Sequence, residues 1–245
     1  MTAAQIVGEK TLEKLTFVIT AGPTREYIDP VRFISNPSSG KTGFEIARAA
    51  ARRGHRAIVV AGPVSLATPR GTERLDAVSA RDMMRETRKA LASAASPEKT
   101  VFIATAAVAD WRPAKKAAKK IKKAAFDGVL RLVRNPDILK SVRGVVKIGF
   151  AAETGDAVKQ AAAKCKAKDL EFVVANDVTV PGAGFGCDTN IVAFVRRDGS
   201  VERKPKMSKR ALAAEIVKSA EDAVRARLKK ISRYAIIPQN KEDER

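Results

Sequence analysis

Short apolar runs alternate with stretches of helical periodicity along most of the chain. The apolar runs at residues 17–19, 57–61, 101–104, 145–151 and 171–175 predict buried strands, and the stretches at residues 41–53, 79–93 and 156–167 predict helices between them. Strands that alternate with helices favour a parallel sheet covered on both faces. We therefore expect an α/β fold, Rossmann-like and mostly parallel, with helices on both faces of the sheet.

The C-terminal third adds two elements of another kind. Residues 191–194 and Val201, on either side of an Asp198-Gly199 turn signal, predict an antiparallel hairpin. Residues 208–228 predict an amphipathic helix, with an apolar face formed by Leu212, Ile216, Val217, Ala220 and Val224. We divide the chain into an N-terminal segment (1–15), one domain (16–231) and a tail expected to be disordered (232–245).

Composition narrows the class of protein. No run of 18 apolar residues and no signal-peptide core occurs, so neither membrane insertion nor export is expected. The two cysteines, Cys165 and Cys187, show no metal-binding spacing and fit a reducing compartment, by default the cytoplasm. We interpret the one histidine, His55, as a solvated turn residue, which argues against a Ser/His/Asp triad and against a histidine-based metal site.

The net charge of +20 predicts an acidic ligand. Nucleic acid, a membrane surface and phosphorylated small molecules are the candidates. An aromatic content of 5% provides few platforms for base stacking, which argues against nucleic acid. Phosphorylated small molecules fit best.

Residues 20–43, between the first strand and the first helix, form the most informative segment. The end of this segment, Pro37-Ser-Ser-Gly-Lys-Thr-Gly43, places backbone N–H groups and hydroxyls at a helix start, where an anion is favoured. A P-loop would need glycine at position 35, which is serine, and the dinucleotide fingerprint is absent. Asn36 is left as an unusual polar residue between a strand end and an anion site.

Three further features could carry chemistry. The segment 106–113 follows a strand directly and places Asp110 at the carboxyl edge of the sheet, where it could bind a ligand or serve as a helix cap or a turn carboxylate. Residues 111–125 are rich in lysine, and fit a mobile flap that closes on a polyphosphate, a basic amphipathic helix for nucleic acid or membrane, or a solvated loop. Lys164 and Lys168 lie four residues apart on one helix face, as surface pairs often do.

Eight collinear motifs together resemble phosphopantothenoylcysteine synthetase (phosphopantothenate-cysteine ligase), in its bacterial and archaeal branch. They lie at residues 20–26, 29–36, 38–41, 106–113, 120–123, 135–139, 149–154 and 175–177. The resemblance implies a ligase of coenzyme A biosynthesis that joins 4'-phosphopantothenate and L-cysteine. In that reaction the carboxylate attacks the α-phosphate of CTP, pyrophosphate leaves, and the cysteine amine displaces CMP from the acyl-cytidylate.

The resemblance also implies roles for individual residues. Asn36 and Lys120 are similar to catalytic residues, Lys120 within a flap at about residues 111–128. The phosphopantothenate contacts are expected at Arg32, Asn36, Ala106, Ala107 and Asp110, with Arg32 reaching in from a second subunit. The nucleotide contacts are expected at Gly22, Ser38, Gly40, Gly43, Asp110, Lys120, Pro136, Asp137, Ile138, Leu139, Phe150, Lys164, Lys168 and Asn176.

Cofactors and partners follow from the same resemblance. Mg²⁺ would accompany the CTP co-substrate, although no carboxylate cluster in the sequence marks its ligands, and ATP is the alternative nucleotide. A homodimer is implied. Many relatives carry a fused decarboxylase, and here about 15 residues precede the first strand, so decarboxylation is expected in a separate polypeptide or in a longer protein from which this domain is excised. The alternative function is a basic nucleic-acid-binding or scaffold protein on the same fold.

Overall fold

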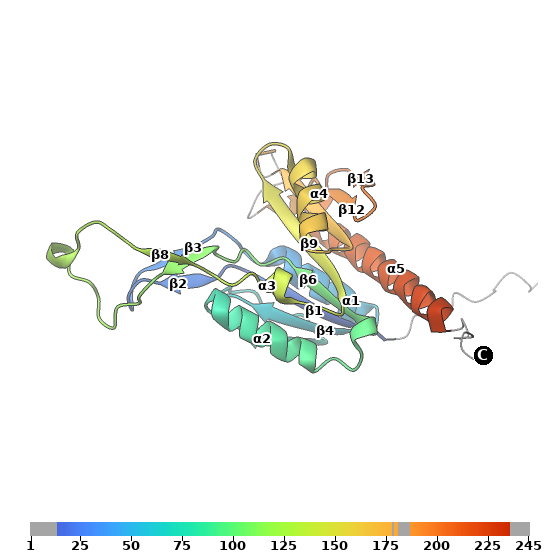
Figure 1. Ribbon diagram of the computed structural model, residues 1–245, viewed down its shortest axis with the longest axis horizontal. Helices are drawn as coiled ribbons and strands as arrows, with labels where there is room; N and C mark the ends of the chain where they lie inside the picture. The colour runs from blue at the N-terminus through green and yellow to red at the C-terminus, as the bar shows by residue number, and fades with distance from the viewer. Residues whose placement is uncertain (1–13, 178, 181–186, 236–245) are drawn as a thin grey trace, which may run out of the picture.

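A computed structural model describes residues 14–177, 179–180 and 187–235, and an eight-stranded sheet runs through its body (Figure 1). The strand order is β13-β12-β10-β9-β6-β1-β4-β5. From β10 to β5 all neighbours are parallel, whereas β12 and β13 continue the sheet in antiparallel fashion. The strands are β1 (Thr16–Ala21), β4 (Arg56–Ala61), β5 (Thr72–Asp76), β6 (Thr100–Ala104), β9 (Val146–Glu153), β10 (Phe172–Asp177), β12 (Ala193–Arg196) and β13 (Val201–Arg203). The expected α/β fold is confirmed.

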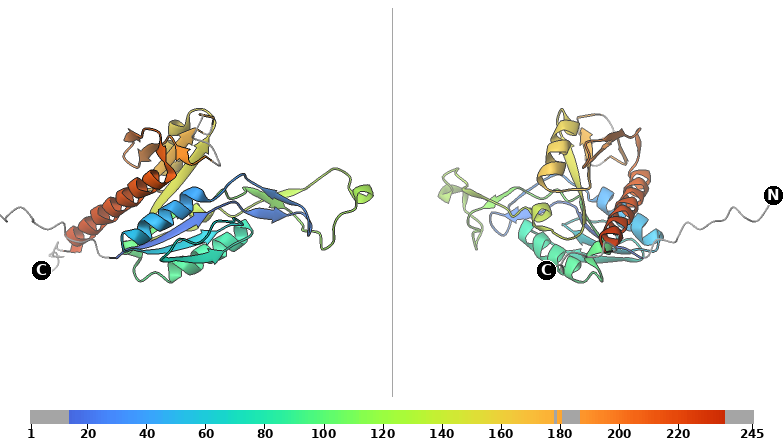
Figure 2. Two further views of the ribbon diagram at one scale, coloured as in Figure 1. Left: turned by 180° about the vertical axis from the view of Figure 1, so that it is seen from behind. Right: turned by 45° about the vertical axis from the view of Figure 1, so that its right-hand side comes forward.

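Helices cover both faces of this sheet. On one face α1 (Lys41–Arg52) packs beside α5 (Lys209–Ala235), as the view from behind shows (Figure 2). On the other face lie α2 (Ala80–Ala92), the short α3 (Ile138–Ser141) and α4 (Ala157–Ala167). Burial of apolar side chains on both faces explains why the strands consist of continuous apolar runs. No helix in the part of the chain that the structure describes is long and apolar enough to cross a membrane.

The predicted helix signals are present. The Ser79 hydroxyl accepts a hydrogen bond from the Asp82 N–H while the Asp82 carboxylate accepts one from the Ser79 N–H, which completes the capping box. All five residues of the expected apolar face of α5 are buried. α5 continues to Ala235, four residues into the expected tail, and residues 236–245 lie outside the described part, as does most of the N-terminal segment.

Two short antiparallel pairs form an arm that projects from the body (Figure 1). One pair joins β2 (Arg25–Tyr27) to β3 (Phe33–Ser35), and the other joins β7 (Trp111–Pro113) to β8 (Leu132–Arg134). We use the name arm for residues 25–35 and 111–134. The basic segment forms the loop between β7 and β8, with one 3-10 turn, η2 (Lys123–Ala125), so the amphipathic-helix alternative is wrong. A second 3-10 turn, η1 (Pro97–Lys99), precedes β6, and β11 (Thr189–Asn190) pairs with β14 (Met207–Ser208).

The interpretation of His55 as a solvated residue is wrong. Its side chain is only 4% exposed, because α5 covers the turn after α1. Nδ1 accepts a hydrogen bond from the Leu15 N–H at 3.3 Å, and Nε2 lies 2.8 Å from Oε1 of Glu221. Arg53 pairs with the same carboxylate, so His55 helps to fasten α5 to the body.

Candidate active site

The strand order places a switch point between β1 and β6. From β1 the chain moves through β4 to β5 on one side, and then returns to β6 on the other side of β1. In open α/β sheets ligands bind at the carboxyl ends of strands at such a point. A cavity of about 540 Å³ lies there, and we refer to it as the carboxyl-edge pocket.

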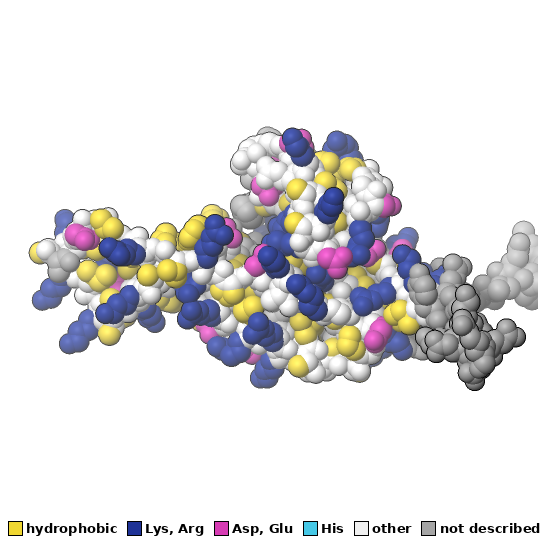
Figure 3. Space-filling model, viewed as in Figure 1, with side chains coloured by type: hydrophobic (Ala, Val, Ile, Leu, Met, Phe, Trp, Pro, Cys, Tyr) yellow, Lys and Arg dark blue, Asp and Glu magenta, His cyan; other side chains and the backbone are white. Residues whose placement is uncertain are grey.

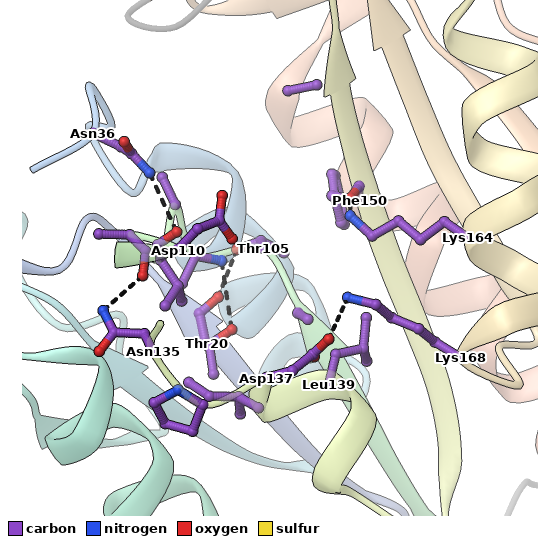
Figure 4. Close-up of a pocket in the computed structure, with 18 of the residues that line it drawn as sticks. Thr20, Asn36, Thr105, Asp110, Asn135, Asp137, Leu139, Phe150, Lys164 and Lys168 are labelled. Atoms are coloured by element: carbon purple, nitrogen blue, oxygen red, sulfur yellow. Dashed lines mark hydrogen bonds and ion pairs between the residues drawn. The ribbon is translucent and has the colours of Figure 1, made fainter. Parts of the chain in front are cut away.

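Six separate segments form the wall of this pocket (Figure 4). They are the end of β1, the two residues that follow β3, the end of β6 with the loop after it, the turn into α3, and the facing surfaces of β9 and α4. The pocket is lined by Thr20, Asn36, Pro37, Ala104, Thr105, Ala106, Ala107, Val108, Ala109, Asp110, Asn135, Pro136, Asp137, Ile138, Leu139, Phe150, Ala152, Glu153, Lys164 and Lys168. The structure therefore brings together Asn36, the Ala106–Asp110 loop, the turn into α3, Phe150 and the lysine pair.

Side-chain amides hold the loop after β6. Nδ2 of Asn36 donates to the carbonyl oxygen of Val108 at 3.2 Å, and Nδ2 of Asn135 donates to that of Ala109 at 2.8 Å. The Asn135 N–H donates to the carbonyl oxygen of Asp110, also at 2.8 Å. Three consecutive carbonyl groups are thus fixed, which orients the backbone that leads to the exposed Asp110 carboxylate.

Two ammonium groups approach the pocket from the side of α4. Nζ of Lys164 donates to the carbonyl oxygen of Phe150, and Nζ of Lys168 lies 2.9 Å from Oδ2 of Asp137. Burial, reinforced by the neighbouring charge of Lys168, lowers the pKa of Lys164. A multiply charged anion would relieve this repulsion, so this side of the pocket is suited to a polyphosphate.

The groups around Asp137 stabilise its charged form, whereas those around Lys164 destabilise the charged form. Burial by itself would raise the pKa of its carboxyl group, but the Lys140 N–H and the Lys168 ammonium stabilise the charged form, and the net effect lowers the pKa. Asp137 also caps α3 through its bond from the Lys140 N–H at 2.9 Å. It therefore stays ionised and keeps Lys168 aimed at the pocket.

The predicted residues at the start of α1 lie behind the pocket wall. A Cβ atom on Gly43 would lie 2.6 Å from both Cβ of Ala21 and Oγ1 of Thr105, which is far inside normal contact. Gly40, with φ +76°, caps α1 against the backbone of Gly22. These glycines let α1 approach the ends of β1 and β6. None of Gly22, Ser38, Gly40 and Gly43 lines the cavity.

Two other predicted residues lie on the arm, away from the pocket of the same chain. The Arg32 guanidinium binds both the Asp29 carboxylate, at 2.5 and 3.0 Å, and the carbonyl oxygen of Ile121, at 2.9 Å. Arg32 thereby holds the pKa of the buried Asp29 carboxyl group well below its usual range. Lys120 precedes this anchor point in the loop. Asn176 is buried in β10, beside Ala152 of the pocket but not in the lining.

Sequence reasoning missed Thr20, Thr105, Asn135 and Glu153. The hydroxyl of Thr105 donates to the carbonyl oxygen of Thr20 at 2.6 Å, which joins the ends of the two central strands. Their position directly after apolar runs was the available signal, since strand ends meet at one edge of a parallel sheet. Asn135 directly precedes Pro136 and Asp137, which were predicted as nucleotide contacts.

Several known proteins are similar to this chain in sequence. A family model described as DNA/pantothenate metabolism flavoprotein C-terminal domain matches residues 12–223. The coenzyme A biosynthesis bifunctional protein CoaBC of Escherichia coli is 43% identical over 83% of this chain, and that of Bacillus subtilis is 44% identical over 84%. The chain spans about half the length of these curated relatives, 52% and 51%.

Solved structures show the same fold. The crystal structure of the C-terminal domain of a CoaBC protein has a TM-score of 0.73 at 36% identity, and covers 88% of this chain and 98% of its own. A mutant of Cab2 in complex with phosphopantothenate-cysteine has a TM-score of 0.70 at 17% identity, over 88% of this chain and 89% of its own. At that identity the second likeness shows the fold alone.

Proposed function

The chain belongs to the family of the DNA/pantothenate metabolism flavoprotein C-terminal domain, and we propose on that basis that it is a phosphopantothenate-cysteine ligase of coenzyme A biosynthesis. The proposal is supported most directly by one observation. A single pocket combines the amide of Asn36, the fixed loop with Asp110, and the two ammonium groups of Lys164 and Lys168. A carboxylate substrate needs hydrogen-bond donors such as the Asn36 amide, and a nucleoside triphosphate needs cationic groups such as the two ammonium groups, close to each other.

The chemistry requires charge stabilisation more than a strong base. In the first step the carboxylate oxygen of 4'-phosphopantothenate attacks the α-phosphorus of CTP, and pyrophosphate leaves. In the second step the cysteine amine attacks the acyl carbon, the bond to CMP breaks, and the amine loses a proton. Negative charge grows on phosphate oxygens and then on the acyl oxygen, where ammonium and amide donors stabilise it. Lys164 and Lys168 would serve the first step and Asn36 the second.

The residues present fit a magnesium ion that arrives with the triphosphate. Asp110 and Glu153 place carboxylates on the same pocket as the lysine pair, and Mg²⁺ is commonly held by one or two carboxylates together with substrate phosphates. When bound, the ion would neutralise charge on the triphosphate. Within the described residues no group of three or more His, Cys, Asp or Glu side chains forms a dedicated metal cage.

A homodimer through the arm is part of the proposal. Arg32 and Lys120 do not reach the pocket of their own chain in this structure, so a role for them requires a partner's arm or closure of the loop. The arm also exposes apolar side chains that a partner would cover, namely Val31 (57%), Phe33 (40%), Trp111 (44%), Leu132 (43%) and Val133 (37%). Phe33→Asp should shift the protein to monomer in sedimentation analysis and abolish turnover; an active monomer would contradict this part of the proposal.

The alternative is that the chain is a basic nucleic-acid-binding or scaffold protein with the same fold. Pyrophosphate release from CTP in the presence of both 4'-phosphopantothenate and cysteine separates the two. Turnover with ATP but not CTP would overturn only the nucleotide assignment, whereas no release with either nucleotide would overturn the ligase. The free thiols of Cys165 and Cys187 are consistent with a cytoplasmic location.

The role of Asn36 is tested by separating the two steps. Asn36→Asp should still release pyrophosphate but stall before the amide forms, because a carboxylate cannot donate to the acyl oxygen. Lys120→Gln should weaken closure of the loop and slow turnover. A normal yield of amide product from Asn36→Asp would show that Asn36 does not have this role.

A further inference from the structure

A second cavity, of about 440 Å³, lies where the arm meets the N-terminus of α2. We call it the arm-base cleft. It has no lining residue in common with the carboxyl-edge pocket. Four cationic residues line it, Arg25 from β2, Arg81 from α2, and Arg112 and Lys116 from β7 and the loop that follows. Lys and Arg side chains gather at this junction of arm and body in the space-filling view (Figure 3).

The two carboxylates of the cleft are already bound elsewhere. Glu26 is buried and accepts a hydrogen bond from the Ala80 N–H at 2.8 Å, so it caps α2. Asp82 accepts bonds from the N–H and the hydroxyl of Ser79, at 3.0 and 2.7 Å, and pairs with Arg85 at 2.7 Å. Neither carboxylate is therefore available as a counterion for the four cations.

None of the four cations forms an ion pair with any carboxylate among the residues that the structure describes. Arg25 lies over the Phe33 ring at 4.7 Å, and the Lys116 ammonium lies 5.1 Å from the centre of the Tyr27 ring. Arg112 donates only to neutral acceptors, the carbonyl oxygen of Arg134 and Oδ1 of Asn135. Aromatic, carbonyl and amide contacts thus hold Arg25, Lys116 and Arg112 in place without pairing them with a carboxylate.

We propose that the arm-base cleft is a second anion site, which binds a small molecule that carries a phosphate group. Guanidinium groups recognise phosphate oxygens through paired hydrogen bonds, and several of them around one cleft favour a dianion over a simple carboxylate. Tyr27, Val78 and Pro113 give the cleft an apolar wall against which an organic portion can pack.

Arg112 connects this cleft to the carboxyl-edge pocket. Its guanidinium donates to Oδ1 of Asn135 at 3.2 Å, and the amide nitrogen of Asn135 holds the Ala109 carbonyl group of the pocket loop. An anion in the cleft attracts Arg112 and weakens its long bond to Asn135. Occupation of the cleft therefore loosens one support of the loop.

The test uses inorganic phosphate as the probe, at low ionic strength, with calorimetry as the readout. Because the proposed function also places phosphate near Lys164 and Lys168, all measurements are made in the Lys168→Gln background. Adding Arg25→Gln and Arg81→Gln should weaken phosphate binding at least about tenfold, since two charge-assisted contacts are lost. The combination of Arg88→Gln and Lys89→Gln is the matched control, because it removes the same number of charges from exposed positions on α2 that do not line the cleft. It should leave the affinity unchanged.

Hydrogen exchange supplies a second measurement that needs no cleft variant. In the Lys168→Gln background, phosphate should slow exchange at residues 25–27 and 78–82, and speed it at residues 106–110. Equal affinities in the double variant and the control, or protection confined to the carboxyl-edge pocket, would overturn the proposal. An equal loss in both variants would show attraction to net charge alone, and would overturn it too. None of these readouts depends on ligase activity, so failure here leaves the proposed function standing.

Discussion

Gly43→Ala tests why position 43, at the start of α1, requires a residue without a Cβ atom. We expect the reason to be close packing behind the pocket rather than direct contact with a ligand. The added Cβ would lie 2.6 Å from Cβ of Ala21 and from Oγ1 of Thr105. Carbon atoms normally approach to about 3.5–4.0 Å, so the start of α1 or the loop after β6 must move by about 1 Å. Thr105 cannot turn away without losing its 2.6 Å hydrogen bond to Thr20.

The expected loss of stability follows from three terms. Overpacking of this kind costs about 1–3 kcal/mol, and a lost hydrogen bond about 1 kcal/mol more. Alanine stabilises a helix by about 1 kcal/mol relative to glycine, which offsets part of this loss. A net loss of about 2 kcal/mol would lower Tm by roughly 4–8 °C in a protein of this size.

Thermal unfolding and steady-state kinetics together check this reasoning. Because Thr105 lines the pocket, Gly43→Ala should also raise the KM for CTP. Gly54→Ala is the control, since a Cβ there meets nothing within 4 Å and the cost arises only from φ +83°. It should lower Tm without changing KM. A Gly43→Ala protein with the Tm and KM of the parent would refute the packing argument.

Two further predictions concern the pocket. Asn135→Ala removes the 2.8 Å hydrogen bond to the Ala109 carbonyl oxygen. In steady-state kinetics it should raise the KM for 4'-phosphopantothenate about tenfold, with a smaller effect on kcat. An unchanged KM would exclude a positioning role for Asn135. Folding lowers the pKa of Lys164, and a bound triphosphate should raise this pKa again, so that binding at a pH near it is accompanied by proton uptake. Calorimetry in buffers of different ionisation enthalpy should detect this uptake in the parent and not in Lys164→Gln; proton release on binding would contradict the assignment.

The sequence by itself determined the strands β1, β4, β6, β9 and β10, the hairpin of β12 and β13, and the helices α1, α2, α4 and α5, but not β5 or the strands of the arm. Apolar runs buried on two faces, the Ser79–Asp82 capping box and the apolar face of α5 are local patterns, because each depends on residues within a few turns or one strand. The motifs after the strands were also readable, and they identified the loop with Asp110. Their joint resemblance to one ligase family was recognisable for the same reason.

Only the tertiary structure decided which of these pieces meet. Thr20 touches Thr105 because β1 and β6 are neighbours across the switch point, and Asp137 reaches Lys168 because α3 and α4 cover the same face. His55 is buried against a carboxylate 166 residues away, and the basic segment forms a loop that Arg32 and Asp29 anchor at Ile121 in the arm. Such contacts depend on chain topology rather than on local periodicity, so residue spacing could not reveal them.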